Sequence, residues 1–345
     1  MENKSHKDEI IRKAKEVQET KVRIALFGQP GAGKSSLINA IIGEDKFETG
    51  VKTDTTKSAE EVEYKGLSFV DLPGYGTSGF PKENYLKKFD ILNFDIFLCI
   101  FDGKLREADV EFFNKLREVK KICIFVRTKE DTLFQKGRTV EELKFEIIQD
   151  VKKLVDGGIK ICFVSIRTVA GIDELESCIQ SSLGDLKRQR FVMAAKAYTK
   201  SFLDEKRKAC KNYAMLVAAA ASVTNLVPIP GLSITANITA VLSIFENIND
   251  AFSVSAWDLN LFKQKFPYYA ELIDMIIPNV TTSTVVTLME MFGPKLIATQ
   301  TADFIPIIGP VIAPMVNFAM IKGVSDAYID AVYKIAIKNM ENNVI

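Results

Sequence analysis

Blocks of apolar and polar residues alternate between residue 21 and about residue 187. Five blocks are almost continuously apolar, as is typical of strands buried on both faces of a parallel sheet. They are VRIALF (22–27), LSFVDL (67–72), FDIFLCIF (94–101), KICIFVR (121–127) and IKICFVS (159–165). Helical periodicity between them predicts helices at about 34–43, 82–92, 105–119, 139–155 and 171–183. The alternation predicts a doubly wound α/β domain with right-handed crossovers.

The rest of the chain shows only helical patterns. Residues 3–20 carry a narrow apolar stripe, which predicts a helix that packs on another part of the chain. Beyond residue 187 two weakly charged segments contain similar breaks, LVPIPG (226–231) and FIPIIG (304–309), which we interpret as a repeated helix, Pro-x-x-Gly turn and helix. We therefore expect an N-terminal helix (1–20), a mostly parallel α/β domain (21–187) and a C-terminal helical domain (188–345), with the first and last forming one all-α domain.

Composition narrows the function classes. The 345-residue chain has a net charge of +1, so no basic field indicates nucleic-acid binding. Its five cysteines lack metal-ligand spacing and predict free thiols in a reducing compartment. His6 is the single histidine, which disfavours histidine-based catalysis. The N-terminal residues lack an apolar signal-peptide core, so we expect a cytoplasmic protein, with any membrane attachment peripheral.

GQPGAGKSS (28–36) matches the phosphate-binding pattern G-x-x-x-x-G-K-[ST] between a predicted strand and a predicted helix. Such a loop points its backbone N–H groups at phosphates, and the helix N-terminus adds a favourable dipole. Lys34 would neutralise the β- and γ-phosphates, and the Ser35 hydroxyl would bind Mg²⁺. The remaining loop positions expected at the phosphates are Gly28, Gly31, Ala32, Gly33 and Ser36.

A second motif, DLPG (71–74), ends a predicted strand. Asp71 would hold Mg²⁺ through water, and the N–H of Gly74 would approach the γ-phosphate. The switch threonine should lie in GVKTDTTKS (50–58); we favour Thr56 as a Mg²⁺ ligand, and Thr53 and Thr55 remain alternatives. Ras-like GTPases place a water-orienting glutamine directly after the DxxG glycine. Tyr75 stands there, so hydrolysis should be slow unless another group supplies catalysis.

The third motif identifies the base. Thr128, Lys129 and Asp131 match [NT]-K-x-D at the end of a predicted strand. A carboxylate at Asp131 accepts from both N1–H and N2–H₂ of guanine, whereas adenine offers no such pair of donors. The stem of Lys129 would pack along the base. In VSIR (164–167), Ser165 and Ile166 fit a loop whose backbone contacts the guanine O6. The predicted ligands are therefore GTP and GDP with Mg²⁺.

These stretches together resemble the immunity-related GTPases. The matching parts are GQPGAGKSSLINAI (28–41), TGVKTDTT (49–56), DLPGYGTSGFPKENYL (71–86), FVRTKED (125–131) and the two Pro-x-x-Gly hairpins. The resemblance implies a Ras-like P-loop GTPase domain, slow hydrolysis alone and GTP-dependent dimerisation through G domains, with action at membranes in cell-autonomous defence. It also implies a catalytic role for Asp54, where the family has glutamate. Bacterial GTPases with a Pro-rich helical tail look similar as well.

Alternatives concern the helical domain and the reaction. The uncharged segment 212–245 is long enough to span a membrane, but its Pro and Gly residues divide it, so we expect a buried hairpin, with a membrane-inserting hairpin as the alternative. The main functional hypothesis is a dimer-activated GTPase whose helical domain contacts a membrane or a protein target. A nucleotide-gated scaffold with negligible turnover is the second. An Era-like ribosome-associated GTPase is the third, and the lack of a basic RNA-binding domain counts against it.

Overall fold

The chain forms two compact units in a computed structural model. One unit is Thr20–Tyr198, and the other combines the described residues up to Glu19 with those from Thr199 onward. The first unit extends past residue 187 because α7 (Asp185–Ala194) packs on two of its strands. The structure describes residues 12–13, 16–17, 19–47, 59–155, 158–224, 232–254, 260, 263–264 and 312–341.

A six-stranded sheet in the order β2-β3-β1-β4-β5-β6 forms the centre of the first unit. Its strands are β1 (Val22–Gly28), β2 (Glu60–Tyr64), β3 (Leu67–Asp71), β4 (Ile96–Phe101), β5 (Ile122–Arg127) and β6 (Ile161–Phe163). All neighbours pair in parallel except β2, which runs antiparallel to β3 at the edge. Sequence patterning did not predict β2 because its three glutamates interrupt any apolar run, as an edge strand permits.

Helices follow the parallel strands near the positions that the periodicity predicts, except that the helix expected at 82–92 ends at Lys88. They are α2 (Lys34–Ile42), α3 (Lys82–Lys88), α4 (Glu107–Glu118), α5 (Val140–Leu154) and α6 (Ile172–Ser181), and a 3₁₀ turn, Ile91–Asn93, follows α3. Local chemistry fixes several boundaries. Gly33 and Gly43, both left-handed, flank α2. A capping box between Thr139 and Glu142 begins α5.

The two faces of the sheet are covered by different helices. On one face α3, α4 and α5 enclose an apolar cluster in which Phe112 contacts the rings of Phe27, Tyr85 and Phe97. On the other face α2, α6 and α7 pack against the strands and one another. The unit is therefore doubly wound and mostly parallel, which confirms the predicted fold class.

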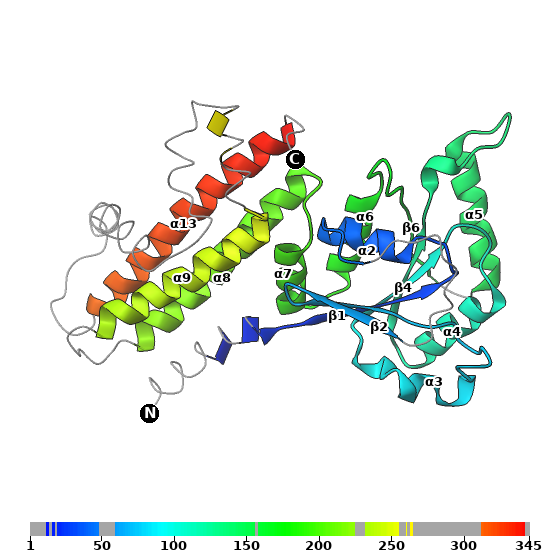
Figure 1. The fold of residues 1–345 in the computed structure, drawn as a ribbon, viewed down its shortest axis with the longest axis horizontal. Helices are drawn as coiled ribbons and strands as arrows, with labels where there is room; N and C mark the ends of the chain where they lie inside the picture. Colours follow the sequence, from blue (N-terminus) through cyan, green and yellow to red (C-terminus); the bar gives the residue numbers. More distant parts are fainter. Residues whose placement is uncertain are drawn as a thin grey trace. The chain divides into compact units, whose positions relative to one another are not determined.

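The second unit is helical throughout its described part. α8 (Lys200–Thr224), α9 (Leu232–Phe252) and α13 (Ile312–Glu341) pack against one another (Figure 1). Phe245 stacks on Tyr328 with ring centroids 3.9 Å apart, and buried Lys206 donates to the carbonyl of Ala251. None of the described helices is both long and apolar enough to cross a membrane. Both Pro-x-x-Gly turns lie outside the described residues.

Candidate nucleotide-binding site

The loop between β1 and α2 has a backbone that its glycines make possible. Gly28, Gly31 and Gly33 have φ values of +131°, +77° and +87°. A Cβ on Gly28 would lie 1.9 Å from the carbonyl oxygen of Ile100 on β4. The turn closes where Ala32 N donates to Gln29 O at 3.2 Å. The result is a tight loop at the start of a helix, which is the backbone form that binds phosphate groups.

Lys34 reaches back over this loop. Its Nζ lies 3.3 Å from the carbonyl oxygens of both Gly28 and Gln29. It also lies 3.8 Å from Oδ1 of Asp71, the last residue of β3. The ammonium group therefore joins the first motif to the DLPG motif. In that second motif, Thr77 donates to the carbonyl oxygen of Gly74 at 3.1 Å.

Thr128 joins the third motif to the first. It is buried directly after β5, and its hydroxyl donates to Ala32 O at 2.6 Å. Its N–H donates to Phe101 O, at the end of β4, at 3.0 Å. The next residue, Lys129, has a φ of +56° and forms an ion pair with Asp102. This threonine therefore fixes the distance between the phosphate loop and the [NT]-K-x-D motif.

Asp131 and the loop after β6 are the remaining parts of the candidate nucleotide site. Hydrogen bonding from Ser165 is the main cause that holds the pKa of Asp131 below its usual range, and the Arg167 guanidinium, 2.9 Å away, acts in the same direction. Ser165 is buried, and its N–H donates to Ala170 O at 2.9 Å. Ile166 Cδ1 lies 3.6 Å from the position of a Cβ on Gly33. The loop thus adjoins both an ionised carboxylate and the phosphate loop.

Tyr75 lies in the apolar core and not in the polar site. It is 8% exposed and stacks on Phe112 with ring centroids 5.0 Å apart. It also meets Tyr85 edge-on at 5.1 Å, and Tyr85 in turn donates to the carbonyl oxygen of Pro73. Burial raises the pKa of Tyr75. In this conformation the side chain packs in the core, so it is not placed to orient an attacking water.

The switch I residues Thr53, Asp54, Thr55 and Thr56 lie outside the described residues. The structure adds two partners that motif matching did not single out, Asp102 at Lys129 and Arg167 at Asp131. Arg167 ends the VSIR stretch, so its position was visible in the sequence, but its ion pair depends on a contact between distant loops.

Asp109, in the first turn of α4, is a further acidic residue near this site. Burial raises the pKa of its carboxyl, and the nearby Lys34 opposes that shift. Its Oδ2 is buried and has no hydrogen-bond partner within the described parts of the chain. Nothing in the sequence patterns distinguished it from the other acidic residues of α4.

The oxygen atoms that could bind a metal ion at this site come from two separate motifs. Within the described residues no group of three or more His, Cys, Asp or Glu side chains could hold a metal ion. Mg²⁺ prefers oxygen ligands and commonly takes one or two carboxylates together with substrate phosphates. The Ser35 hydroxyl and the Asp71 carboxylate, on the two motifs that Lys34 joins, therefore fit that ion.

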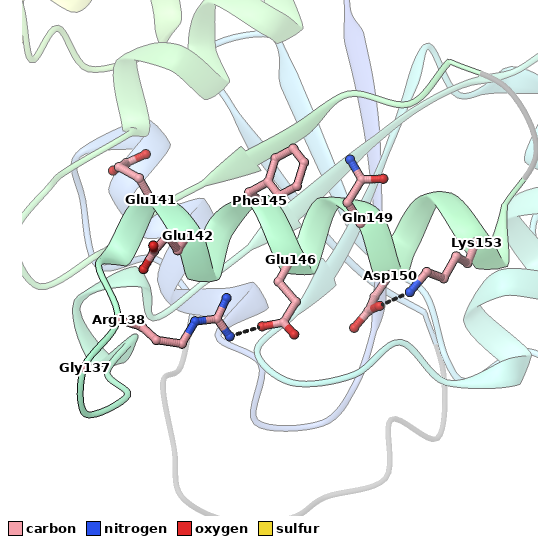
Figure 2. Close-up of a pocket in the computed structure, with 9 residues that line it drawn as sticks. All are labelled: Gly137, Arg138, Glu141, Glu142, Phe145, Glu146, Gln149, Asp150 and Lys153. Carbon is pink, nitrogen blue, oxygen red and sulfur yellow. Dashed lines mark hydrogen bonds and ion pairs between the residues drawn. The ribbon is translucent and has the colours of Figure 1, made fainter.

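A shallow depression of about 660 Å³ lies elsewhere in the same unit, along the outer face of α5 (Figure 2). Its lining residues form two ion pairs, Arg138 with Glu146 at 2.5 Å and Lys153 with Asp150 at 3.0 Å. None of the motif residues lines it. The nucleotide site is therefore defined by its loops and not by this depression.

Comparisons with known proteins agree with the motifs. The family model Interferon-inducible GTPase (IIGP) matches residues 4–285. Interferon-gamma-inducible GTPase 10 of Mus musculus is 28% identical over 233 residues, covering 62% of this chain and 56% of its own length. Interferon-inducible GTPase 5 of Bos taurus is 22% identical over 353 residues, covering 93% of this chain and 76% of its own length.

A solved structure of a probable GTP-binding protein, engB, is 23% identical with a TM-score of 0.35, and the match covers 47% of this chain and 98% of that one. The chain spans 56% and 57% of the lengths of two mouse relatives that it matches. The family model covers most of the chain, and the protein therefore belongs to the interferon-inducible GTPase family.

Proposed function

We propose that the protein binds GTP and GDP with Mg²⁺ and hydrolyses GTP slowly until two of its G domains meet. One observation carries the proposal: Thr128 donates to Ala32 O, which holds the guanine motif against the phosphate loop. Family membership supports the same chemistry.

Each motif has a distinct role in this proposal. The N–H groups of the phosphate loop cradle the β- and γ-phosphates, and Lys34 neutralises their charge. Ser35, Asp71 through water and Thr56 hold Mg²⁺. The N–H of Gly74 approaches the γ-phosphate, and Asp54 assists catalysis from switch I. The residues in contact with the nucleotide are Gly28, Gly31, Ala32, Gly33, Lys34, Ser35, Ser36, Thr128, Lys129, Asp131, Ser165 and Ile166.

Replacing Asp131 with asparagine tests the base assignment. The carboxylate accepts from N1–H and N2–H₂ of guanine, whereas the asparagine amide places a donor opposite the N2–H₂ group. Because an unpaired buried polar group costs about 1–3 kcal/mol, GTP affinity should fall roughly ten- to a hundredfold. Xanthosine triphosphate has an oxygen in place of the amino group, so its affinity should rise. Equilibrium binding of both nucleotides measures the change.

Asp150→Asn is the matched control, since Asp150 lies on α5 in an exposed ion pair with Lys153. Its affinities for the two nucleotides should equal those of the unmodified protein. Unchanged preference for GTP in Asp131→Asn would show that another residue selects the base.

Dimerisation is proposed because the protein lacks a water-orienting side chain at the usual position. Tyr75 is packed in the core, so the missing catalytic group would come from a second G domain. The helical domain would then transmit the change to a membrane or a protein target, in a cell-autonomous defence or membrane-remodelling role. This part of the proposal rests on the family to which the chain belongs.

A second candidate function is a nucleotide-gated scaffold with negligible turnover. The buried Tyr75 favours it, because nothing requires that a partner restore the missing group. An Era-like role on the ribosome has less support, since the net charge of +1 gives the chain no overall basic field to attract RNA.

A further inference from the structure

Aliphatic and basic side chains gather at the amino edge of the sheet, opposite the nucleotide loops. We call Leu92, Ile122, Lys120 and Lys121 the amino-edge patch. Lys121 Nζ donates to Phe94 O at 2.9 Å and also to the carbonyl oxygen of Leu92. These contacts bring the turn before β4 and the turn before β5 together. The motif loops follow the carboxyl ends of the same strands, so the patch and the nucleotide site occupy opposite edges.

Exposed leucine and isoleucine residues mark this edge. Leu92 is 62% exposed and Ile122 is 43% exposed. Leu154 ends α5, and Leu186 lies in the first turn of α7 beside Lys187, which pairs with Asp95 just before β4. Among the described residues of Thr20–Tyr198, these four are the exposed leucines and isoleucines. Phe134, Val140, Phe145 and Val169 are exposed elsewhere in the unit, so what distinguishes this edge is that its exposed aliphatic side chains stand among lysines.

The lysines at this edge carry charge that the protein does not neutralise. Lys87, Lys88, Lys120 and Lys121 form no ion pair with any described residue, although Lys88 lies over the Phe80 ring and Lys121 donates to two backbone carbonyl oxygens. The acidic neighbours are already engaged, since Asp90 pairs with Arg23 at 3.7 Å and Asp95 pairs with Lys187. Helix dipoles favour basic residues near helix C-termini, which accounts for some of the lysines but not for the exposed aliphatic side chains between them.

We propose that the amino-edge patch binds an anionic lipid surface. The ammonium groups of Lys87 and Lys120 would contact the headgroups, and Leu92 and Ile122 would enter the interface between headgroups and acyl chains. Separate aliphatic tips among lysines suit a deformable lipid surface better than a protein partner, which would need a matching shape. The proposal adds a membrane contact on the G domain to the one proposed for the helical domain. The nucleotide site on the opposite edge remains accessible.

Charge reversal on the full chain tests the electrostatic part. Lys120→Glu is compared with Lys136→Glu, because both lysines are exposed and neither forms an ion pair with a described residue. Lys136 precedes α5, near the edge of the nucleotide loops. Each nearby basic residue contributes about fivefold to binding of anionic membranes, so reversing Lys120 should weaken binding roughly twentyfold. Lys136→Glu should bind within about twofold of the unmodified protein.

The probe is sedimentation with vesicles of phosphatidylcholine, with and without phosphatidylserine, at low and physiological salt. We expect binding only with phosphatidylserine, weakening as salt rises. Equal loss in Lys120→Glu and Lys136→Glu, or equal binding to both vesicles, would overturn the proposal. Lipid contacts of the helical domain do not affect this comparison, since they are common to both variants.

Leu92→Ser tests insertion of the aliphatic side chains. It should weaken vesicle binding several-fold, because serine removes the apolar side chain that would enter the lipid interface. Unchanged binding in Leu92→Ser would overturn insertion. GTP affinity is measured for each variant. Vesicle binding that is unaffected by the variants, with GTP affinity intact, would refute the lipid site alone, whereas absence of GTP binding in the unmodified protein would refute the proposed function.

Discussion

Gly28 shows how closely a single residue can be constrained by its surroundings. It ends β1 opposite Ile100, with a positive φ and no room for a side chain. The constraint comes from outside the phosphate loop, because the carbonyl oxygen of Ile100 belongs to the neighbouring strand. A side chain at this position would push the loop away from β4.

Gly28→Ala should therefore destabilise the fold and weaken GTP binding together. The strained backbone alone costs about 1–3 kcal/mol, and the 1.9 Å approach to Ile100 adds to it. Gly31→Ala is the matched control, since its φ of +77° is also positive but no atom lies within 4 Å of the added Cβ. Denaturant unfolding measures both. A smaller loss in Gly28→Ala than in Gly31→Ala would contradict the steric argument.

Much of the candidate site could be anticipated at the residue scale, because each motif is continuous in sequence. Lys34, Thr128 and Asp131 were expected in one site, and the structure brings their loops together. Arg167 was not expected at Asp131, since its ion pair joins loops that are distant in sequence. The core packing of Tyr75 also depends on Phe112 and Tyr85, which no local pattern connects to it.

At the scale of elements, the strongest patterns gave the most accurate predictions. β4 is buried along its whole length, so its apolar run is unmistakable. β2 is short and charged, and only its pairing with β3 makes it a strand. α3 ends at Lys88 and not near residue 92, because Asp90 takes a left-handed conformation that begins a separate 3₁₀ turn. Local propensity cannot anticipate that break.

Thr139→Ala should destabilise α5 without affecting the nucleotide. The threonine hydroxyl accepts from Glu142 N at 3.2 Å, and the Glu142 carboxylate accepts from Thr139 N at 2.9 Å. Loss of such a cap costs about 0.5–2 kcal/mol. Thermal unfolding with and without GTP checks this. Ser177→Ala, which removes an exposed hydroxyl that donates to Asp173 O within α6, is a control for loss of a hydroxyl alone, and an equal loss there would argue against the capping box.

Asp330 links α13 to α8 and predicts a pH dependence for the helical unit. Burial raises the pKa of its carboxyl. Hydrogen bonds from Arg207 and Lys211, each 2.8 Å long, lower that pKa by more, so the net pKa is depressed. The stabilisation is present above the unfolded pKa of about 3.9 and is lost as the pH falls through the lower folded value.

In Asp330→Asn the free energy of unfolding should therefore decrease less as the pH is lowered than it does in the unmodified protein. The measurement is the free energy of unfolding from neutral to acidic pH. Asp150→Asn is the control, because its carboxylate pairs with Lys153 on an exposed helix face. A pH profile in Asp330→Asn that matches the unmodified protein would show that this ion-pair group does not contribute.

At the scale of the whole molecule, the α/β unit separates its two proposed surfaces. The motif loops follow the carboxyl ends of the strands, and the amino-edge patch lies at their beginnings. A second G domain and a lipid surface would thus not compete for the same edge. The helical unit, built from α8, α9 and α13, would carry the further surface that we propose for a membrane or protein target.

The most direct test of dimer activation is GTP turnover per protomer, measured with Mg²⁺ over a wide range of protein concentrations. Because Tyr75 is packed against Phe112 and we propose that a second G domain completes the site, turnover per protomer should be slow at low concentration and rise until dimerisation saturates. Turnover per protomer that stays constant at every concentration would contradict this mechanism, and a constant value near zero would identify a scaffold instead.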